Sequence, residues 1–223
     1  MRAAQRLRHT VFAHSPAARL TSEAGLDVDE FDDACDHLIV EHRPTGEVVG
    51  TYRLLPPGRT TDLYAAGEFD VDALDPLRPS LIEAGRSRVH PDHRTGAVIT
   101  LMWSALARYP LLSGYHYLAD CASVQLADGG RAAASTWQLA QTNHSSPADL
   151  RVRPHRPWRA PETDERPSYA QLPPLLRGYL RLGAWVCAPP AHDPDFGVAD
   201  FFVLLQLNRI DERYLRYFLG DHR

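Results

Sequence analysis

Hydrophobic positions recur with a helical period in several parts of the chain. In residues 3–13, Leu7 and Val11 lie four positions apart, which predicts a helix over Ala3–Ala13. The segment Ala97–Tyr109 is apolar nearly all round, except for polar residues at every fourth position, and is therefore expected to form a largely buried helix. Shorter helical patterns cover residues 131–142, 174–182 and 212–219.

Strand patterns lie between these helices. Residues 36–42 and 47–55 flank Arg43-Pro44-Thr45-Gly46, where proline second and glycine fourth suit a type I turn, so a hairpin is predicted. The unbroken apolarity of 198–207 is typical of a strand buried on both faces. The alternation of strands and helices predicts an α/β or α+β sheet core. Other strands are expected near residues 81–90, 117–124 and 184–188.

The length of 223 residues predicts a single domain over 1–223. Residues 56–79 mix turn residues with short apolar pieces and are expected to be loop with a possible short helix. Residues 144–174 are rich in proline and arginine. Because proline cannot donate a backbone hydrogen bond, this segment is expected to be a long surface arm without regular pairing.

Composition excludes several function classes. No apolar run reaches the length of about 18 residues that a membrane span needs, and the basic N-terminus lacks a signal-peptide core, so an intracellular location is expected. All 24 basic residues are arginine, which excludes lysine Schiff-base and P-loop lysine chemistry. The net charge of -4 argues against a general nucleic-acid binder. The three cysteines, Cys35, Cys121 and Cys187, have no paired spacing and are expected to be buried thiols.

The segment Leu81–Gly96 carries the clearest chemical signal. It combines a strand with charged groups, a turn rich in hydrogen-bond donors, and the start of the helix expected from Ala97. Helix N-termini bind anionic groups such as a phosphate or pyrophosphate, so this unit suggests a thioester-carrier site beside a carboxylate, Glu83. His90 and His93 lack persuasive third and fourth ligands, and no metal site is expected.

The strand, turn and helix resemble the acyl-donor motif of the GNAT superfamily of acyltransferases. Four further motifs in the same order are similar to the branch that contains ornithine-lipid N-acyltransferases and acyl-homoserine-lactone synthases. Two later stretches, Leu172–Gly183 and His192–Phe202, are closer to the ornithine-lipid type. The four motifs are Leu7-Arg8-x-x-Val11-Phe12, Asp29-Glu-Phe-Asp32, Gly50-Thr-Tyr-Arg53 and Glu83-x-x-Arg86.

The resemblance implies a GNAT-like mixed, mostly antiparallel sheet flanked by helices. It implies a fatty, often 3-hydroxyacyl, thioester on the phosphopantetheine of acyl carrier protein or coenzyme A as donor, with no tightly bound cofactor. The turn Arg94-Thr95-Gly96 is one residue tighter than the usual coenzyme A motif, which favours acyl carrier protein. The donor contacts implied in this sequence are Arg88, Val89, His90, Arg94, Thr95 and Gly96.

For the acceptor, the resemblance implies the α-amine of L-ornithine, giving a lyso-ornithine lipid. Glu83 is the expected base and Arg86 its catalytic partner, while backbone N–H groups of residues 85–89 are candidates to polarise the thioester oxygen. The alternative is that Glu83 is only a structural partner of an arginine. Candidate acceptor-binding residues are Arg8, Asp29, Asp32 and Arg53, with Asp29, Asp32 and Asp193 as possible partners of the side-chain ammonium.

Other functions stay open. The acceptor could be a different amino acid or amine, although Gly85 disfavours the homoserine-lactone reaction because that branch often carries serine or threonine there. A non-catalytic module that binds an acyl carrier or a lipid is a second alternative. The arginines of residues 144–174 could dock acidic acyl carrier protein, contact anionic lipid in a peripheral membrane association, or only aid solubility.

Overall fold

The computed structural model describes residues 1–13, 25–161 and 166–219. Its α-helices are α1 (Arg2–Ala13), α2 (Gly96–Leu112), α3 (Arg131–Asn143), α4 (Pro174–Arg181) and α5 (Glu212–Leu219). Its strands are β1 (Asp36–His42), β2 (Glu47–Leu55), β3 (Phe69–Asp70), β4 (Leu81–Val89), β5 (Tyr117–Gln125), β6 (Arg153–Pro154), β7 (Trp185–Val186), β8 (Ala191–Asp193) and β9 (Val198–Gln206). Short 3-10 turns connect them; η2 (Tyr64–Gly67) and η3 (Asp72–Ser80) occupy most of the predicted loop.

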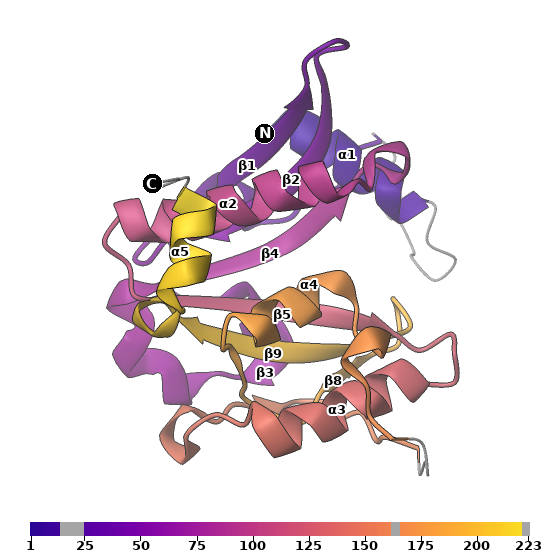
Figure 1. Cartoon of the computed structure of the whole chain (residues 1–223), viewed down its shortest axis with the longest axis vertical. Helices are drawn as coiled ribbons and strands as arrows, with labels where there is room; N and C mark the ends of the chain where they lie inside the picture. Colours follow the sequence, from indigo (N-terminus) through magenta and orange to yellow (C-terminus); the bar gives the residue numbers. More distant parts are fainter. Residues whose placement is uncertain (14–24, 162–165, 220–223) are drawn as a thin grey trace.

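One seven-stranded sheet organises the chain, in the order β1-β2-β4-β5-β9-β7, with β8 also paired to β9. Every pairing in it is antiparallel except that of β4 with β5, which is parallel. Figure 1 shows helices against this sheet. Strands β1, β2 and β4 form one half of it, β5 and β9 lie in the other half, and the two halves meet at the parallel pair of β4 and β5. The predicted mixed, mostly antiparallel architecture is confirmed.

The predicted hairpin forms at the predicted residues. β1 and β2 pair antiparallel, and the N–H groups of both Thr45 and Gly46 donate to the carbonyl of His42. Gly46 has φ +68, a conformation that glycine adopts without steric cost. The turn residues therefore set the register of the first two strands.

Two apolar layers cover the two faces of the sheet. On one face, α2, α3 and α4 contribute Met102, Leu139 and Leu176 to a core that includes Ile82 and Ala84 of β4. On the other face, a second cluster joins Leu81 of β4 to residues of η2, β3 and β9. Alternate residues of β4 thus face different layers, as the two-residue period of a strand requires.

The expectation that residues 144–174 lack regular pairing is wrong. β6 pairs with β3, Val152 is buried in the second apolar cluster, and its N–H donates to the carbonyl of Cys187 at 3.1 Å. Farther on, the N–H of His192 in β8 donates to the carbonyl of Arg156, and the N–H of Trp158 donates to the carbonyl of Pro190, just before β8. Proline removes only its own N–H, so the residues between prolines still pair. Arg151, Arg153, Arg156 and Arg159 nevertheless remain exposed, as predicted for this segment.

Sequence periodicity missed two features of the C-terminal half. The strand expected over 184–188 is reduced to β7, two residues long, and the three-residue β8 was not predicted. Both are held by pairing to β9, so the partner strand stabilises them rather than their own pattern. In the parts of the chain that the structure describes, no helix is both long and apolar enough to cross a membrane.

The close approach of α4 to α2 depends on a glycine. A Cβ added to Gly178 would lie 2.5 Å from Cζ2 of Trp103, a ring that is itself packed edge-on against Tyr179. We predict that Gly178→Ala lowers the free energy of unfolding by about 1–3 kcal/mol, because the added methyl group overpacks this contact. At an open helical position the same change would raise it by roughly 1 kcal/mol. Denaturant unfolding measures the difference.

The matched control is Gly96→Ala, because nothing lies within 4 Å of a Cβ at Gly96, the first residue of α2. Gly96→Ala is expected to leave the unfolding midpoint unchanged or raised. A Gly178→Ala variant as stable as Gly96→Ala would contradict this account of the contact between α2 and α4.

Candidate active site

The central cavity lies where β4 and β5 separate. Their parallel pairing runs from Leu81 opposite Tyr117 to Ala84 opposite Asp120 and then stops, although both strands continue for five more residues. Figure 1 shows the two strands diverging beyond this point. A cavity of about 710 Å³ opens there, lined on the β4 side by residues 84–88 and on the β5 side by Asp120, Cys121, Ser123 and Gln125. We call this place the fork.

A bulge in β4 bends the strand at the fork. Opposite β2, Arg53 pairs with Gly85 and Thr51 with Arg88, so Arg86 and Ser87 face the single residue Tyr52. Arg86 has φ +52, a left-handed conformation that non-glycine residues rarely adopt. The extra residue of a bulge leaves the ladder and bends its strand, which turns the end of β4 away from β5.

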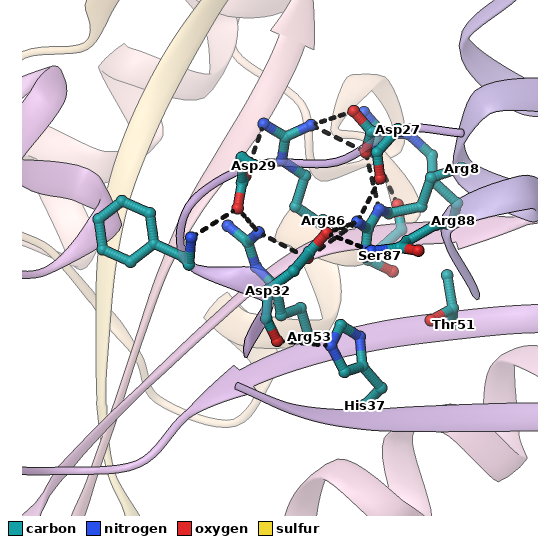
Figure 2. Close-up of polar contacts among 12 residues, drawn as sticks. Arg8, Asp27, Asp29, Asp32, His37, Thr51, Arg53, Arg86, Ser87 and Arg88 are labelled. Atoms are coloured by element: carbon teal, nitrogen blue, oxygen red, sulfur yellow. Dashed lines mark hydrogen bonds and ion pairs between the residues drawn. The ribbon is translucent and has the colours of Figure 1, made fainter. Parts of the chain in front are cut away.

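An ion-pair cluster fixes this bulge to the N-terminal region (Figure 2). Arg86 donates to both carboxylate oxygens of Asp27, at 2.8 and 2.9 Å, and its other nitrogen lies 3.0 Å from Asp29. Arg8 of α1 donates to Asp27 and, at 2.7 Å, to Asp32. Arg53 of β2 donates to Asp29 and Asp32. The network thus joins α1, β2 and β4 to the acidic loop, the segment that carries Asp27, Asp29 and Asp32.

The centre of this network is almost dry. Arg8 and Asp32 expose only 1% and 2% of their surface. Burial would raise the pKa of the Asp32 carboxyl, but hydrogen bonds from Gln5, Arg53 and Arg8 outweigh it and hold the pKa below its usual value. Because both oxygens of Asp32 already accept hydrogen bonds, this carboxylate is a structural partner of the arginines and has no oxygen to spare for an acceptor ammonium.

The structure therefore brings Arg8, Asp29, Asp32, Arg53 and Arg86 together as one cluster, of which only Arg86 lines the central cavity. Asp27 belongs to the same cluster and sequence reasoning missed it. It stands at the start of the acidic run that begins two residues before Asp29. That run indicates acidic partners for the arginines, but its sequence does not show that Asp27, rather than Glu30 or Asp33, is one of them.

Glu83 lies on the face of β4 opposite α2 and α4 and is only 5% exposed. Its oxygens accept from the backbone N–H groups of Tyr64 at 2.6 Å and Ala65 at 2.8 Å. Burial raises its pKa to about 7, although these donors and Arg53 favour the ionised form. Glu83 lines a small hollow together with Gly85, Tyr64 and Arg53, next to the central cavity, which shares Gly85 and Tyr64.

Tyr64 links Glu83 to the ion-pair cluster. Its ring lies under the guanidinium groups of both Arg53, at 5.0 Å, and Arg86, at 5.3 Å, and its hydroxyl accepts from Arg86 at 3.1 Å. Cations over an aromatic face are attracted by the ring quadrupole. The turn η2 is therefore held to the end of β4 through both its backbone and its side chain.

The residues expected to contact the donor divide into two sets. Arg88 and Arg94 line the central cavity, together with Pro91. Val89 pairs with Gly50 and packs against the main apolar core, and the backbone N–H of His90 donates to the carbonyl of Val49. Thr95 and Gly96 form the N-terminus of α2, at which the Thr95 side chain makes no capping hydrogen bond.

An acidic wall faces the cavity on the side of Glu83. We use this name for Glu68, Asp193 and Asp200, which all line the cavity. Asp200 of β9 is 4% exposed. Burial and the neighbouring carboxylates raise the pKa of Glu68 to about 8, and burial likewise raises the pKa of Asp200. This wall contains Asp193, one of the three aspartates considered for ammonium recognition.

The remaining sequence candidates have ordinary surroundings. Cys121 lines the cavity, but burial raises the pKa of its thiol, so little reactive thiolate forms. His90 and His93 pack on each other, and His93 on His42. Within the described ranges there is no group of three or more histidine, cysteine or acidic residues arranged to hold a metal ion.

Comparison with known proteins shows the family of this chain. Residues 7–104 match the model of an acetyltransferase (GNAT) domain. The chain is 33% identical over 244 residues to the L-ornithine N(alpha)-acyltransferase of Brucella abortus, covering 98% of this chain and 84% of the relative. It is 35% identical over 239 residues to the enzyme of the same name from Rhodobacter capsulatus, covering 98% of this chain and 90% of the relative.

Solved structures support the fold. The structure of a CoA-dependent acyl-homoserine lactone synthase, BjaI, with SAM and isopentyl-CoA superposes with a TM-score of 0.55 at 19% identity, over 97% of this chain and 81% of that one. The acyl-homoserine lactone synthase LasI gives the same TM-score at 13% identity, over 98% and 87%. The identities above 30% along nearly the whole chain decide the family. This chain is an N-acyltransferase with a GNAT fold and belongs to the family of L-ornithine N(alpha)-acyltransferases.

Proposed function

We propose that the protein transfers a fatty acyl group, 3-hydroxylated in the natural donor, from the phosphopantetheine thioester of acyl carrier protein to the α-amine of L-ornithine. The observation that carries the proposal is the fork, a cavity of about 710 Å³ lined by both arginines and carboxylates, in a chain related to L-ornithine N(alpha)-acyltransferases. The product would be a lyso-ornithine lipid.

The donor end of the cavity is the side of α2 and α4. Arg94 and Pro91, before α2, and Leu175 of α4 line it. A helix N-terminus and an arginine favour an anionic group there, such as the phosphate of phosphopantetheine. The short turn from Arg94 to Gly96 leaves one residue fewer than a coenzyme A site uses, which supports acyl carrier protein as the donor. The exposed arginines of residues 151–159 offer that acidic protein a further contact.

The acceptor end is the side of the acidic wall. Ornithine carries an α-carboxylate and a side-chain ammonium, so it needs partners of both signs. Asp193 and Asp200 supply negative charge, whereas Arg86 and Arg88 line the same cavity with positive charge. Burial and the neighbouring Arg86 lower the pKa of Arg88 to about 10, and an anion bound beside it would relieve that crowding.

Glu83 is proposed to remove the proton that the α-amine loses as it attacks the thioester carbonyl. It lies next to the cavity beyond Gly85, so a bridging water would carry the proton to it, and a base with a pKa near 7 is well matched to neutral pH. The bulge removes Arg86 and Ser87 from the ladder with β2. Their backbone N–H groups are candidates to stabilise the developing oxyanion.

The direct test offers the purified protein acyl thioesters of acyl carrier protein and of coenzyme A with individual amino acids, and identifies products by mass. We predict N(alpha)-acylornithine and free thiol, with higher kcat/KM for the carrier-protein donor and for 3-hydroxyacyl chains. No thiol release with any pair would support a non-catalytic carrier-binding module. Acylation of another amine in preference to ornithine would identify a different acceptor.

The acidic wall predicts selectivity for the side-chain ammonium. Asp200→Asn, a change without loss of volume, should raise KM for ornithine about tenfold or more, because a hydrogen bond to a charged group contributes roughly 1.5–3 kcal/mol. KM for norvaline, which has no ammonium on its side chain, should stay the same. Asp149→Asn, at an exposed position of the 144–174 segment, is the control. Equal KM changes for both amino acids would contradict the assignment.

If Glu83 is the base, the rate of acyl transfer should depend on pH. Because Glu83 must be ionised to accept a proton, the rate should rise as the pH increases toward about 7. Glu83→Gln should lower kcat about 100-fold or more and flatten that rise, whereas Glu47→Gln, on the exposed start of β2, should change neither. Thermal unfolding checks that the variant is folded. Wild-type turnover by folded Glu83→Gln would remove Glu83 from the mechanism.

A further inference from the structure

A second buried carboxylate, Asp120, stands at the fork on the face opposite Glu83. It is the last residue of β5 that pairs with β4, and it lines the central cavity although only 2% of its surface is exposed. Along β5 it is two positions from both Leu118 and Ala122, so it shares the face on which these residues join the apolar core beneath α2 and α4. Its side chain therefore belongs to the donor face of the sheet, and that of Glu83 to the acceptor face.

Two tyrosine hydroxyls hold this carboxylate. Oδ2 of Asp120 accepts from the hydroxyl of Tyr52 on β2 and, at 2.9 Å, from that of Tyr179 on α4. The two hydroxyls are themselves 2.9 Å apart, and Tyr52 and Tyr179 are 1% and 0% exposed. The partners of Asp120 are thus neutral, whereas those of Asp27, Asp29 and Asp32 are arginines. A buried carboxylate without a paired cation takes up a proton readily.

Thioester aminolysis is assisted by an acid as well as by a base. Attack by the amine forms a C–N bond and breaks the C–S bond, and an alkyl thiolate leaves more readily when it is protonated as that bond breaks. On the proposed path the thioester sulfur approaches from the side of α2 and α4, which is the face of Asp120, while the amine approaches from the acidic wall, which is the face of Glu83. Of the two carboxyl groups on either side of the reacting centre, one can therefore serve as the base and the other as the acid.

We infer that Asp120, positioned by Tyr52 and Tyr179, is the proton donor to the departing thiolate. This inference rests on the proposed function. The acceptor ammonium loses one proton to solvent before attack and a second to Glu83 as the C–N bond forms. Asp120 gives its proton to sulfur as the C–S bond breaks. Glu83 then releases its proton and Asp120 regains one from solvent, so the products are an amide, a thiol and one proton.

The charge state of Asp120 suits this role. Burial raises its pKa to about 7, although the tyrosine hydroxyls favour the ionised form. A substantial protonated fraction is therefore present at neutral pH, and its acidity exceeds that of an alkyl thiol, whose pKa is about 8.5 on the cysteine scale. Proton transfer to the thiolate is downhill.

Leaving groups of different basicity test the inference. The probes are two small thioesters of one acyl chain, an N-acetylcysteamine ester with an alkyl thiol and a thiophenol ester whose thiolate needs no proton. Asp120→Asn should lower kcat at least about 100-fold with the alkyl thioester and only a fewfold with the aryl thioester. Glu83→Gln should lose activity equally with both, and Asp149→Asn with neither.

Tyr179→Phe provides a second, milder variant if Asp120→Asn is unstable. Loss of a hydroxyl that stabilises the carboxylate should raise the pKa of Asp120, so the alkaline limb of kcat with the alkyl thioester should move to higher pH, while the aryl thioester shows no such limb. A purely structural role would lower both rates together.

The outcomes are distinct. Equal losses with the two thioesters in Asp120→Asn, or an unmoved alkaline limb in Tyr179→Phe, would overturn the role of Asp120 and leave the proposed function standing. Failure of the wild-type protein to form an N-acyl product from the carrier-protein donor would overturn the proposed function, and the role of Asp120 with it.

Discussion

The site depends on the early end of a single strand pairing. β4 and β5 form the one parallel pair of the main sheet, and they stay paired only from Leu81 to Ala84 on β4. Beyond that point the edge of each strand that faces the other is unpaired. Its backbone N–H and C=O groups can bind a substrate, which would not be possible if they were hydrogen bonded to the neighbouring strand. The gap also opens a passage between the two faces of the sheet, so two substrates can meet without sharing an entrance.

The opening is maintained by charge. The bulge at Arg86 would be strained in isolation, but the guanidinium group is fixed by Asp27, Asp29 and Tyr64. Arg8 and Arg53 bind the same loop from α1 and β2. Removing one partner from such a buried group leaves an uncompensated charge and strongly destabilises the fold. The cluster therefore acts as a brace for β4, and this explains why most of its members do not line the cavity.

Charges of opposite sign are thus separated along the site. Arginines lie at the donor turn and along β4, and carboxylates lie on β8, on β9 and just after η2. The two carboxyls with pKa values near 7 stand at the fork on opposite faces of the sheet. The arginines suit a negatively charged acyl carrier protein at the donor turn. The carboxylates suit an amino acid with a positively charged side chain. On the proposed path, the same separation would place the attacking amine next to Glu83 and the departing thiolate next to Asp120.

Local patterns predicted the local elements. The β1–β2 hairpin and α5 have the expected bounds, since turn residues and helical spacing act over a few positions, and α2 is extended by only a few residues at its ends. The ordered motifs around Arg8, Arg53 and Glu83 predicted the family. They also picked out most members of the ion-pair cluster, but as acceptor-binding residues rather than as a brace. Features that depend on distant partners were missed. β8 exists because β9 pairs with it, and Asp27 and Asp120 acquire their roles from Arg86 and Tyr179, which are 59 positions away along the chain in each case.

A complex of the protein with ornithine and an unreactive thioether analogue of the acyl donor, solved by crystallography, tests the account of the fork most directly. The account predicts the analogue sulfur between Ala84 and Asp120 on the face of α2 and α4, with the ornithine side chain directed to Asp193 and Asp200 on the other face. Both ligands on one face, or the thioether bound outside the fork, would contradict it.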